Sequence, residues 1–395
     1  MTDSLTHLAS EGKNSSFSTG WRTTHFPLRQ GSAMLLMPSK RTTKLFDELW
    51  TLGTTTCCYY GSLHLKATEI LADIAHAKGQ RAFIGKCNMD SPETLPEYYR
   101  DQSAEQSLHE TRSLIKHIRG FPSHGPHQLV QPIITPRFAL GCTREMLTDL
   151  GSLANEEPDL CIQTHISENV QEVEAVKEAF PESKTYAGVY DHYHLLRHNT
   201  ILGHGVHLED DELTLIKERG AGVAHCPTSN FNLRSGIAHI GKYLDRGIKV
   251  GLGTDVSGGF SPSMLTAIRD ASVASKVIAF LPVLCPHASE GVSATSTDAQ
   301  TQFSNKQLSV ATLLYLATLG GAHLCNIHNQ VGSFKAGKGF DALLVSVQSD
   351  TGNLEVWQEK ESLPRMLECF FYCGDDRNIR KVWVQGKLVG GATLD

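Results

Sequence analysis

Residues 160–180, LCIQTHISENVQEVEAVKEAF, contain the pattern from which the fold class follows. It begins with a short apolar run, which predicts a buried strand over 160–165. Its second half places Val173 and Val176 on one helical face, so we predict an amphipathic helix over 169–180. A strand that leads directly into such a helix is the repeating unit of parallel α/β sheets.

The same alternation of strand and helix runs along the chain from about residue 42. It predicts an α/β fold whose parallel sheet has seven strands, at 54–60, 81–89, 130–138, 160–165, 200–207, 220–225 and 248–255. Helices are predicted among and after them at 66–78, 169–180, 210–219, 237–246, 263–280 and 306–324. After Asn329, glycine-punctuated segments predict β hairpins, one of which turns at Gln385-Gly386.

These patterns divide the chain into three parts. Residues 1–41 are expected to be an atypical, flexible N-terminal segment, because their first 32 residues lack periodicity and are rich in turn formers. Residues 42–328 are expected to form the barrel, with a flexible insertion at 286–301. Residues 329–395 are expected to form a small β-sheet module beside it.

Composition excludes several classes of function. The 395 residues carry 36 Lys+Arg and 42 Asp+Glu, and this net charge of −6 argues against a general nucleic-acid or anionic-membrane surface. The longest apolar run, 277–285, is far shorter than the roughly 20 residues that span a bilayer. The ten cysteines include no Cys-x-x-Cys pair, so we expect free thiols and a cytoplasmic protein. Walker, dinucleotide-binding and Gly-x-Ser-x-Gly motifs are absent from the sequence.

Polar side chains at predicted strand ends give the candidate site, because the carboxyl ends of parallel strands converge on one edge. A lone His165 would more simply be a core histidine, but Asp255 ends another apolar strand and favours a shared metal ion. Glu168 could cap the following helix or donate protons over the site. His204, between two glycines, is a second imidazole, and Arg137 could bind a carbonyl or form a salt bridge.

The remaining histidines carry weaker signals. Although His192 and His194 form a His-x-His pair, they lie among polar residues between two elements, so we expect them at the surface. His225, in His-Cys-Pro, is expected to support the site or the core.

Six segments form a further pattern, and five of them lie at predicted strand ends: Thr135-Pro-Arg-Phe138, Thr164-His-Ile-Ser-Glu-Asn169, Gly203-His-Gly205, His225-Cys-Pro227, Gly251-Leu-Gly-Thr-Asp255 and, nearer the C-terminus, Gly374-Asp-Asp-Arg-Asn378. Together these segments resemble the metal-dependent amidohydrolase superfamily and, within it, the guanine deaminase family. The resemblance implies a TIM-like (β/α)₈ barrel and the zinc-dependent hydrolysis of guanine to xanthine and ammonia. It also implies one zinc ion per chain and a homodimer.

The resemblance further implies a role for each candidate residue. His165 and Asp255 would bind zinc, and Asp255 would also accept a proton from the activated water. Glu168 would carry protons to the purine ring and to the leaving amine, while His204 would steady the tetrahedral centre.

The resemblance also implies the substrate contacts. Arg137 would hold the purine carbonyl and Phe138 would lie against the ring, with His165, Glu168 and Asp255 also touching the substrate.

One feature of the family pattern is missing from residues 1–41. The family opens with a strand that ends in His-x-His and supplies two zinc ligands, and no such motif occurs there. We therefore expect seven strands where eight close a barrel, reduced zinc affinity, and open edges at 54–60 and 248–255. Residues 33–37 are the only nearby apolar segment that could fill the gap. The alternatives are a non-catalytic interaction or regulatory form, or a sister aminohydrolase for another heterocycle.

Overall fold

A computed structural model describes residues 38–123, 125, 127–256, 258–284, 301–348 and 362–392. Its main sheet is a curled, parallel array of strands in the order β1 (Thr56–Tyr60), β2 (Arg81–Gly85), β4 (Val130–Pro136), β5 (Cys161–Ile166), β6 (Thr200–His204), β7 (Gly222–His225) and β8 (Lys249–Leu252). A short strand, β3 (Cys87–Asn88), follows β2 and pairs with β4. The predicted seven-stranded parallel sheet is confirmed.

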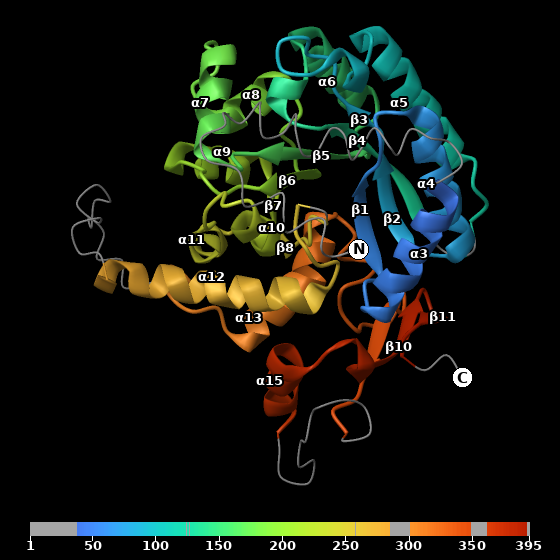
Figure 1. Cartoon of the computed structure of the whole chain (residues 1–395), viewed down its shortest axis with the longest axis vertical. Helices are drawn as coiled ribbons and strands as arrows, with labels where there is room; N and C mark the ends of the chain where they lie inside the picture. The colour runs from blue at the N-terminus through green and yellow to red at the C-terminus, as the bar shows by residue number, and fades with distance from the viewer. Residues whose placement is uncertain are drawn as a thin grey trace.

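Helices follow most of these strands and lie around the outside of the curled sheet (Figure 1). They are α3 (Pro38–Thr51), α4 (Leu65–Lys78), α5 (Ala104–Arg119), α6 (Arg144–Glu156), α7 (Val170–Ala179), α8 (Tyr186–His192), α9 (Asp210–Arg219), α10 (Pro227–Asn232), α11 (Ile240–Asp245) and α12 (Met264–Leu284). The helical path then continues through α13 (Val310–Tyr315), the π-helical turn η5 (Leu316–Gly320) and α14 (Gly321–Leu324). Single 3₁₀ turns occur at η2 (Glu97–Tyr99), η3 (Ala139–Gly141) and η7 (Asp376–Asn378).

The six predicted helices are present, but α3, α5, α6, α8 and α10 lie outside the ranges named from the sequence. Helix α5 shows one reason. Its buried face includes Ser107 and Thr111 beside Leu114 and Ile118. These polar residues interrupt the apolar periodicity that sequence reasoning relies on. They are buried because they hydrogen-bond to Asn88 on β3, a contact that the sequence pattern does not reveal.

The C-terminal part contains a three-stranded antiparallel sheet in the order β11 (Lys387–Gly390), β10 (Ile379–Val384), β9 (Ala342–Val345). The predicted hairpin turn is confirmed: Gln385 and Gly386 both adopt positive φ, at 50° and 81°. A helix, α15 (Leu363–Cys373), lies between β9 and β10 in the sequence and packs against α12. The expected β module is therefore joined by a helix that the sequence analysis did not predict.

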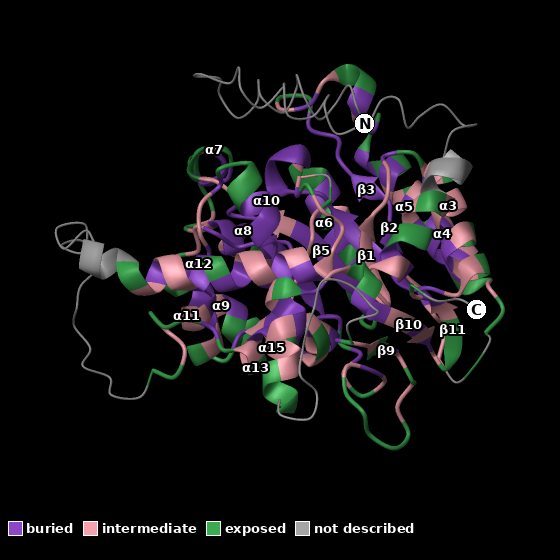
Figure 2. Cartoon of the chain, turned by 60° about the horizontal axis from the view of Figure 1, so that its bottom comes forward, coloured by how far each residue is buried: buried purple, intermediate pink, exposed green. Residues whose placement is uncertain are grey.

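Buried residues concentrate on the strands and on the helix faces that meet them (Figure 2). In the described part of the chain, β1 pairs only with β2 and β8 only with β7, so both ends of the sheet are edges. The segment 33–37 lies outside the described residues, and so do residues 286–300 of the expected insertion at 286–301. Across those described residues, no helix has both the length and the hydropathy needed to cross a membrane.

Candidate metal and catalytic site

Three of the predicted residues meet at the carboxyl edge of the sheet. His165 is the penultimate residue of β5, His204 ends β6, and Asp255 follows β8 after a two-residue turn. Potential ligand atoms of these three side chains all lie within 4.8 Å of one another. His165 and Asp255, ninety positions apart, are thus brought together as the sequence analysis expected.

The backbone at these positions is unusual. His204 and Asp255 adopt positive φ, at 69° and 43°, although neither is glycine. Such conformations cost about 1–3 kcal/mol each and cluster at functional sites. A Cβ atom at Gly258 would lie 2.5 Å from Oδ2 of Asp255, so a side chain there would displace the carboxylate.

Hydrogen bonds orient both imidazole rings toward the centre of the site. Nδ1 of His165 lies 2.6 Å from the backbone carbonyl oxygen of Arg137, and Nδ1 of His204 lies 3.0 Å from Oδ1 of Asn230. Because carbonyl oxygens only accept hydrogen bonds, each Nδ1 carries the proton and each Nε2 keeps its lone pair. Two imidazole nitrogens and a carboxylate form a donor set that suits zinc.

Glu168 lies directly beside this donor set. Its Oε2 is 3.9 Å from Nε2 of His204, and Asp255 Oδ2 is also 3.9 Å from that nitrogen. Ser235 donates its hydroxyl to Oε1 of Glu168 at 3.3 Å. The N-cap of α7 is Asn169, whose side chain accepts the N–H of Glu172, so helix capping does not occupy the Glu168 carboxylate.

The two imidazoles differ in their electrostatics. Burial lowers the pKa of His165, and the neighbouring His204 lowers it further. Burial also acts to lower the pKa of His204, but Glu168 and Asp255 outweigh it and the pKa is raised. Of the two imidazoles, His204 therefore binds a proton or another cation more readily than His165 does.

Arg137 and Phe138 lie at the end of β4. Arg137 is fully buried, and its backbone carbonyl accepts hydrogen bonds from both the backbone N–H and Nδ1 of His165. Its guanidinium Nη1 lies 3.8 Å from Sδ of Met89. Phe138 is buried in the main hydrophobic cluster, with its ring packed over Gly141.

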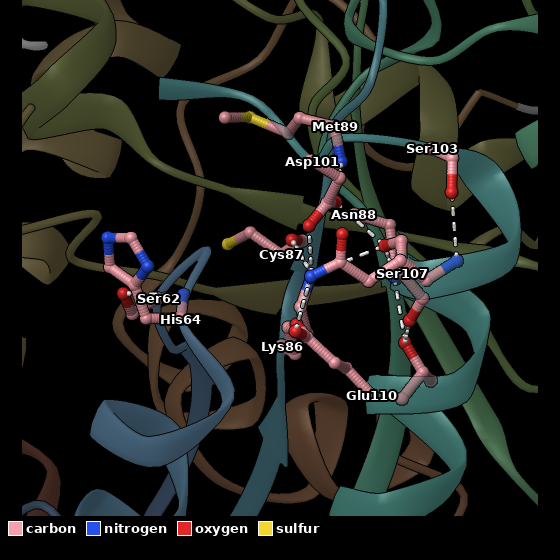
Figure 3. Close-up of polar contacts among 12 residues, drawn as sticks. Ser62, His64, Lys86, Cys87, Asn88, Met89, Asp101, Ser103, Ser107 and Glu110 are labelled. Atoms are coloured by element: carbon pink, nitrogen blue, oxygen red, sulfur yellow. Dashed lines mark hydrogen bonds and ion pairs between the residues drawn. The ribbon is translucent and has the colours of Figure 1, made fainter. Parts of the chain in front are cut away.

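A buried polar cluster fixes the loop that carries Met89 (Figure 3). Lys86 is fully buried and donates to Asp101 at 2.7 Å and to Ser107 at 3.2 Å. Asp101 in turn accepts the backbone N–H of Met89 at 3.0 Å. The cluster borders a mixed-charge cleft of about 440 Å³ that is lined partly by His64 and Glu110.

Sequence reasoning missed several residues that support the site. Asn230, which orients His204, and Tyr60, whose ring centroid lies 4.5 Å from that of His165, carry no local motif. Tyr60 ends a strand, whereas Asn230 lies on helix α10, five residues beyond the end of β7, and the sequence gives no other signal for either residue.

Two predictions concern the remaining histidines. His192 and His194 are exposed, as predicted. His225 is buried, and its Nδ1 finds no hydrogen-bond partner within the described part of the molecule.

A curled parallel sheet with two histidines and an aspartate at its carboxyl edge defines the class of α/β-barrel metallohydrolases. Comparison with protein families makes this class specific. The chain belongs to the amidohydrolase family, whose profile matches residues 43–389.

Similar proteins point to one branch of that family. The chain is 43% identical over 366 residues to a probable guanine deaminase of Schizosaccharomyces pombe, covering 93% of this chain and 65% of that protein. It is 38% identical over 362 residues to the guanine deaminase of Mus musculus, covering 88% of this chain and 73% of that protein. A crystal structure of the guanine deaminase from C. acetobutylicum with bound guanine superposes with a TM-score of 0.81 at 31% identity, covering 97% and 83% of the two chains. The chain thus spans about two thirds to three quarters of the length of these curated relatives.

Proposed function

We propose that this chain hydrolyses guanine to xanthine and ammonia. The observation that carries the proposal is the placement of two carboxylates, Glu168 and Asp255, each 3.9 Å from the same imidazole nitrogen of His204. Hydrolytic deamination needs one group to take a proton from water and another to deliver protons to the substrate and leaving amine. The similarity to a guanine deaminase with bound guanine supports guanine as the substrate.

We infer that one zinc ion per chain is held by His165 and Asp255, with His204 as a third donor. Zinc bound there would lower the pKa of a coordinated water from 15.7 toward about 7. Reduced affinity was expected from two ligands, whereas including His204 gives three, the usual number in catalytic zinc sites.

The remaining chemistry falls to the side chains of this chain. Asp255 accepts a proton from the attacking water, and Glu168 carries protons to the ring nitrogen and to the amine. As the new C–O bond forms and the C–N bond breaks, ammonia leaves. His204 also steadies the charge that develops at the tetrahedral centre. Arg137 donates to the purine carbonyl, and Phe138 packs against the ring.

A turnover assay tests the proposal. The full chain with added zinc should convert guanine to xanthine, followed by the change in ultraviolet absorbance. Glu168→Gln should lower turnover by at least about 100-fold, while Glu178→Gln, at an exposed position on helix α7, which begins two residues after Glu168, should leave it unchanged. Zero turnover by the unsubstituted chain would favour the non-catalytic form, and preference for another aminated heterocycle in competition would favour the sister aminohydrolase.

A titration decides the number of zinc ligands. If His204 is a ligand, zinc should bind tightly at one per chain, and His204→Ala should weaken binding strongly. If the two-ligand count is right, binding is weak from the start and His204→Ala changes it little.

We also infer a homodimer in the cytoplasm. The homodimer rests on the family resemblance, and light scattering after size exclusion would test it by mass. The nine described cysteines are free thiols, which suits a reducing compartment.

A further inference from the structure

The residue Glu172 makes two hydrogen bonds immediately behind the site. It is the third residue of α7 and is almost fully buried. Its Oε2 accepts the backbone N–H of Glu168 at 2.9 Å, and its Oε1 accepts the hydroxyl of Tyr186 at 2.8 Å. One carboxylate therefore ties the backbone of the proposed proton carrier to helix α8.

Helix α9 shows the ordinary form of this arrangement. Its third residue, Glu212, closes a capping box on the backbone N–H of its own N-cap residue, Glu209, at 2.9 Å. In α7 the N-cap is Asn169, yet Glu172 reaches one residue further and binds the N–H of Glu168. The hydrogen bond from the third residue of the helix is thus shifted by one position. In α7 it is made to the backbone of Glu168, whose side chain lies beside the metal donors.

The turn that carries Glu168 is held from both sides. Ser167 adopts a positive φ of 48°, and its carbonyl oxygen accepts the backbone N–H groups of Val206 and His207, at 3.0 and 3.1 Å. These bonds fix the side of the turn toward β6. Glu172 fixes the opposite end.

Helix α8 extends the support to His165. Tyr186 and Tyr190 lie one helical turn apart, with ring centroids 5.5 Å from each other. The hydroxyl of Tyr190 donates to the backbone carbonyl of His165 at 2.7 Å. The two tyrosines of one helix therefore hold both ends of the segment from His165 to Glu168.

The chemistry of Glu172 sets it apart from a simple structural polar residue. Its two hydrogen-bond donors, a backbone amide and a phenol, are both uncharged. Burial, together with a smaller contribution from the nearby Glu168, raises the pKa of Glu172 to about 7. A carboxyl group in this place is costly to bury, and what it provides is two acceptor oxygens in fixed directions.

We propose that Glu172 is a positioning residue that fixes Glu168 against His204 through the Glu168 backbone. The inference rests on the proposed function, because Glu168 is there the proton carrier. Without Glu172, the positive-φ turn loses its anchor at the Glu168 end. The carboxylate of Glu168 then samples positions away from the site.

Hydrogen exchange tests the anchor without any need for turnover. Glu172→Leu keeps the volume of the side chain but removes both acceptors. We expect the Glu168 amide to exchange at least about tenfold faster, while the amides of β5 keep their protection. Glu212→Leu is the matched control, because it removes an equally buried two-acceptor glutamate from α9. Unchanged exchange at Glu168 in Glu172→Leu would overturn the proposal.

Kinetics test whether the anchor acts through Glu168. Glu172→Leu should lower kcat for guanine by about 10- to 100-fold, within the range that general acid–base groups supply, and leave KM within about twofold. Combining it with Glu168→Gln should slow the reaction no further than Glu168→Gln alone. If the double variant loses the product of the two single losses in kcat, or if Glu172→Leu changes KM alone, a positioning role is contradicted.

Two more variants cover the case in which Glu172→Leu does not fold. Glu172→Gln keeps one acceptor and should restore most of the protection at the Glu168 amide. Tyr186→Phe removes one of the two partners of Glu172 and should give an intermediate effect, whereas wild-type exchange in Tyr186→Phe would count against the proposal. Absence of guanine turnover in the unsubstituted chain would overturn the proposed function and leave the exchange experiment to judge the anchor.

Discussion

At the scale of single residues, His204 is the electrostatic centre of the site. Its Nε2 lies 3.9 Å from carboxylate oxygens of both Glu168 and Asp255, and its Nδ1 is bound to Asn230. The bond to Asn230 fixes both the tautomer and the direction of the ring. Residues that orient metal-ligating histidines in this way commonly account for a large part of metal affinity.

Asn230→Ala should therefore weaken zinc binding by about 10- to 100-fold, because His204 loses the acceptor that orients it. Competition with a chelating indicator measures the affinity. Asn155→Ala, at an exposed position on α6 far from the site, is the control and should leave zinc affinity unchanged. Equal affinities in both variants would remove His204 from the ligand set.

A second histidine governs acid stability. Burial lowers the pKa of His225 to about 3, with a smaller contribution from His204. The unfolded chain takes up a proton on this imidazole below about pH 6.5, whereas the folded chain does not until much lower pH. The free energy of unfolding therefore falls as the pH drops between these two values.

His225→Leu should remove this dependence, reducing the slope of unfolding free energy against pH by up to about 1.4 kcal/mol per pH unit between roughly pH 4 and 6. Urea unfolding at several pH values, with a chelator present, measures the slope. His109→Asn, which replaces an exposed histidine, should leave the slope as it is. If His225→Leu and the unsubstituted chain have the same slope, His225 is not buried as a neutral imidazole.

At the scale of elements, the two ends of the sheet differ from its centre. All five residues of β1 are half-buried, whereas all five of β2 are buried. Strand β5 has pairing partners on both sides, β4 and β6. Backbone groups on the outer side of an edge strand need another partner or water.

Alternate amides of β1 should therefore exchange with solvent at least about tenfold faster than those of β5, because they point away from β2. Hydrogen exchange followed by NMR resolves the individual amides. If β1 proves as protected as β5, a further segment pairs with that edge, and the expectation of an open edge is wrong.

At the scale of the whole molecule, one buried ion pair joins the sheet to the C-terminal strands. Arg81 on β2 bonds through Nε and Nη2 to the two carboxylate oxygens of Asp341, at 2.9 and 3.1 Å, and both side chains are nearly inaccessible. Asp341 also accepts the backbone N–H of Gln385 at 2.9 Å. The pair links residues that the sequence analysis assigned to the barrel (42–328) and to the module (329–395), a division that remains a prediction.

Arg81→Met should destabilise the protein by about 3–5 kcal/mol, because it leaves Asp341 buried without its counter-charge. Adding Asp341→Asn should restore part of that loss, since asparagine keeps an oxygen for Gln385. Urea unfolding gives the values. Arg112→Met breaks an exposed ion pair with Glu156 and should cost no more than about 1 kcal/mol. Two separate unfolding transitions in Arg81→Met would indicate that the two parts unfold independently.

The strand pattern was predictable because each buried parallel strand is a short apolar run that ends in polar residues, and this signal is local. The helix α5 was not predicted, because its buried face includes the polar residues Ser107 and Thr111. These accept hydrogen bonds from Asn88, which lies on another element. The roles of Asn230 and Glu172 were missed for the same reason, because their partners come from other elements. Helix α15 was missed although its signal is local: a Ser N-cap and a Pro precede apolar residues at helical spacing.

The α/β class, the seven strands and the strand-end residues His165, His204 and Asp255 could all be predicted from the sequence, because alternation and strand termini are properties of neighbouring residues. The approach of these three side chains to within 4.8 Å of one another is visible only in the folded molecule. The same holds for the ring nitrogen that each histidine offers and for the glutamate that supports the turn of Glu168. Distances and hydrogen-bond partners depend on how the strands curl and pack, and no local pattern encodes that curvature.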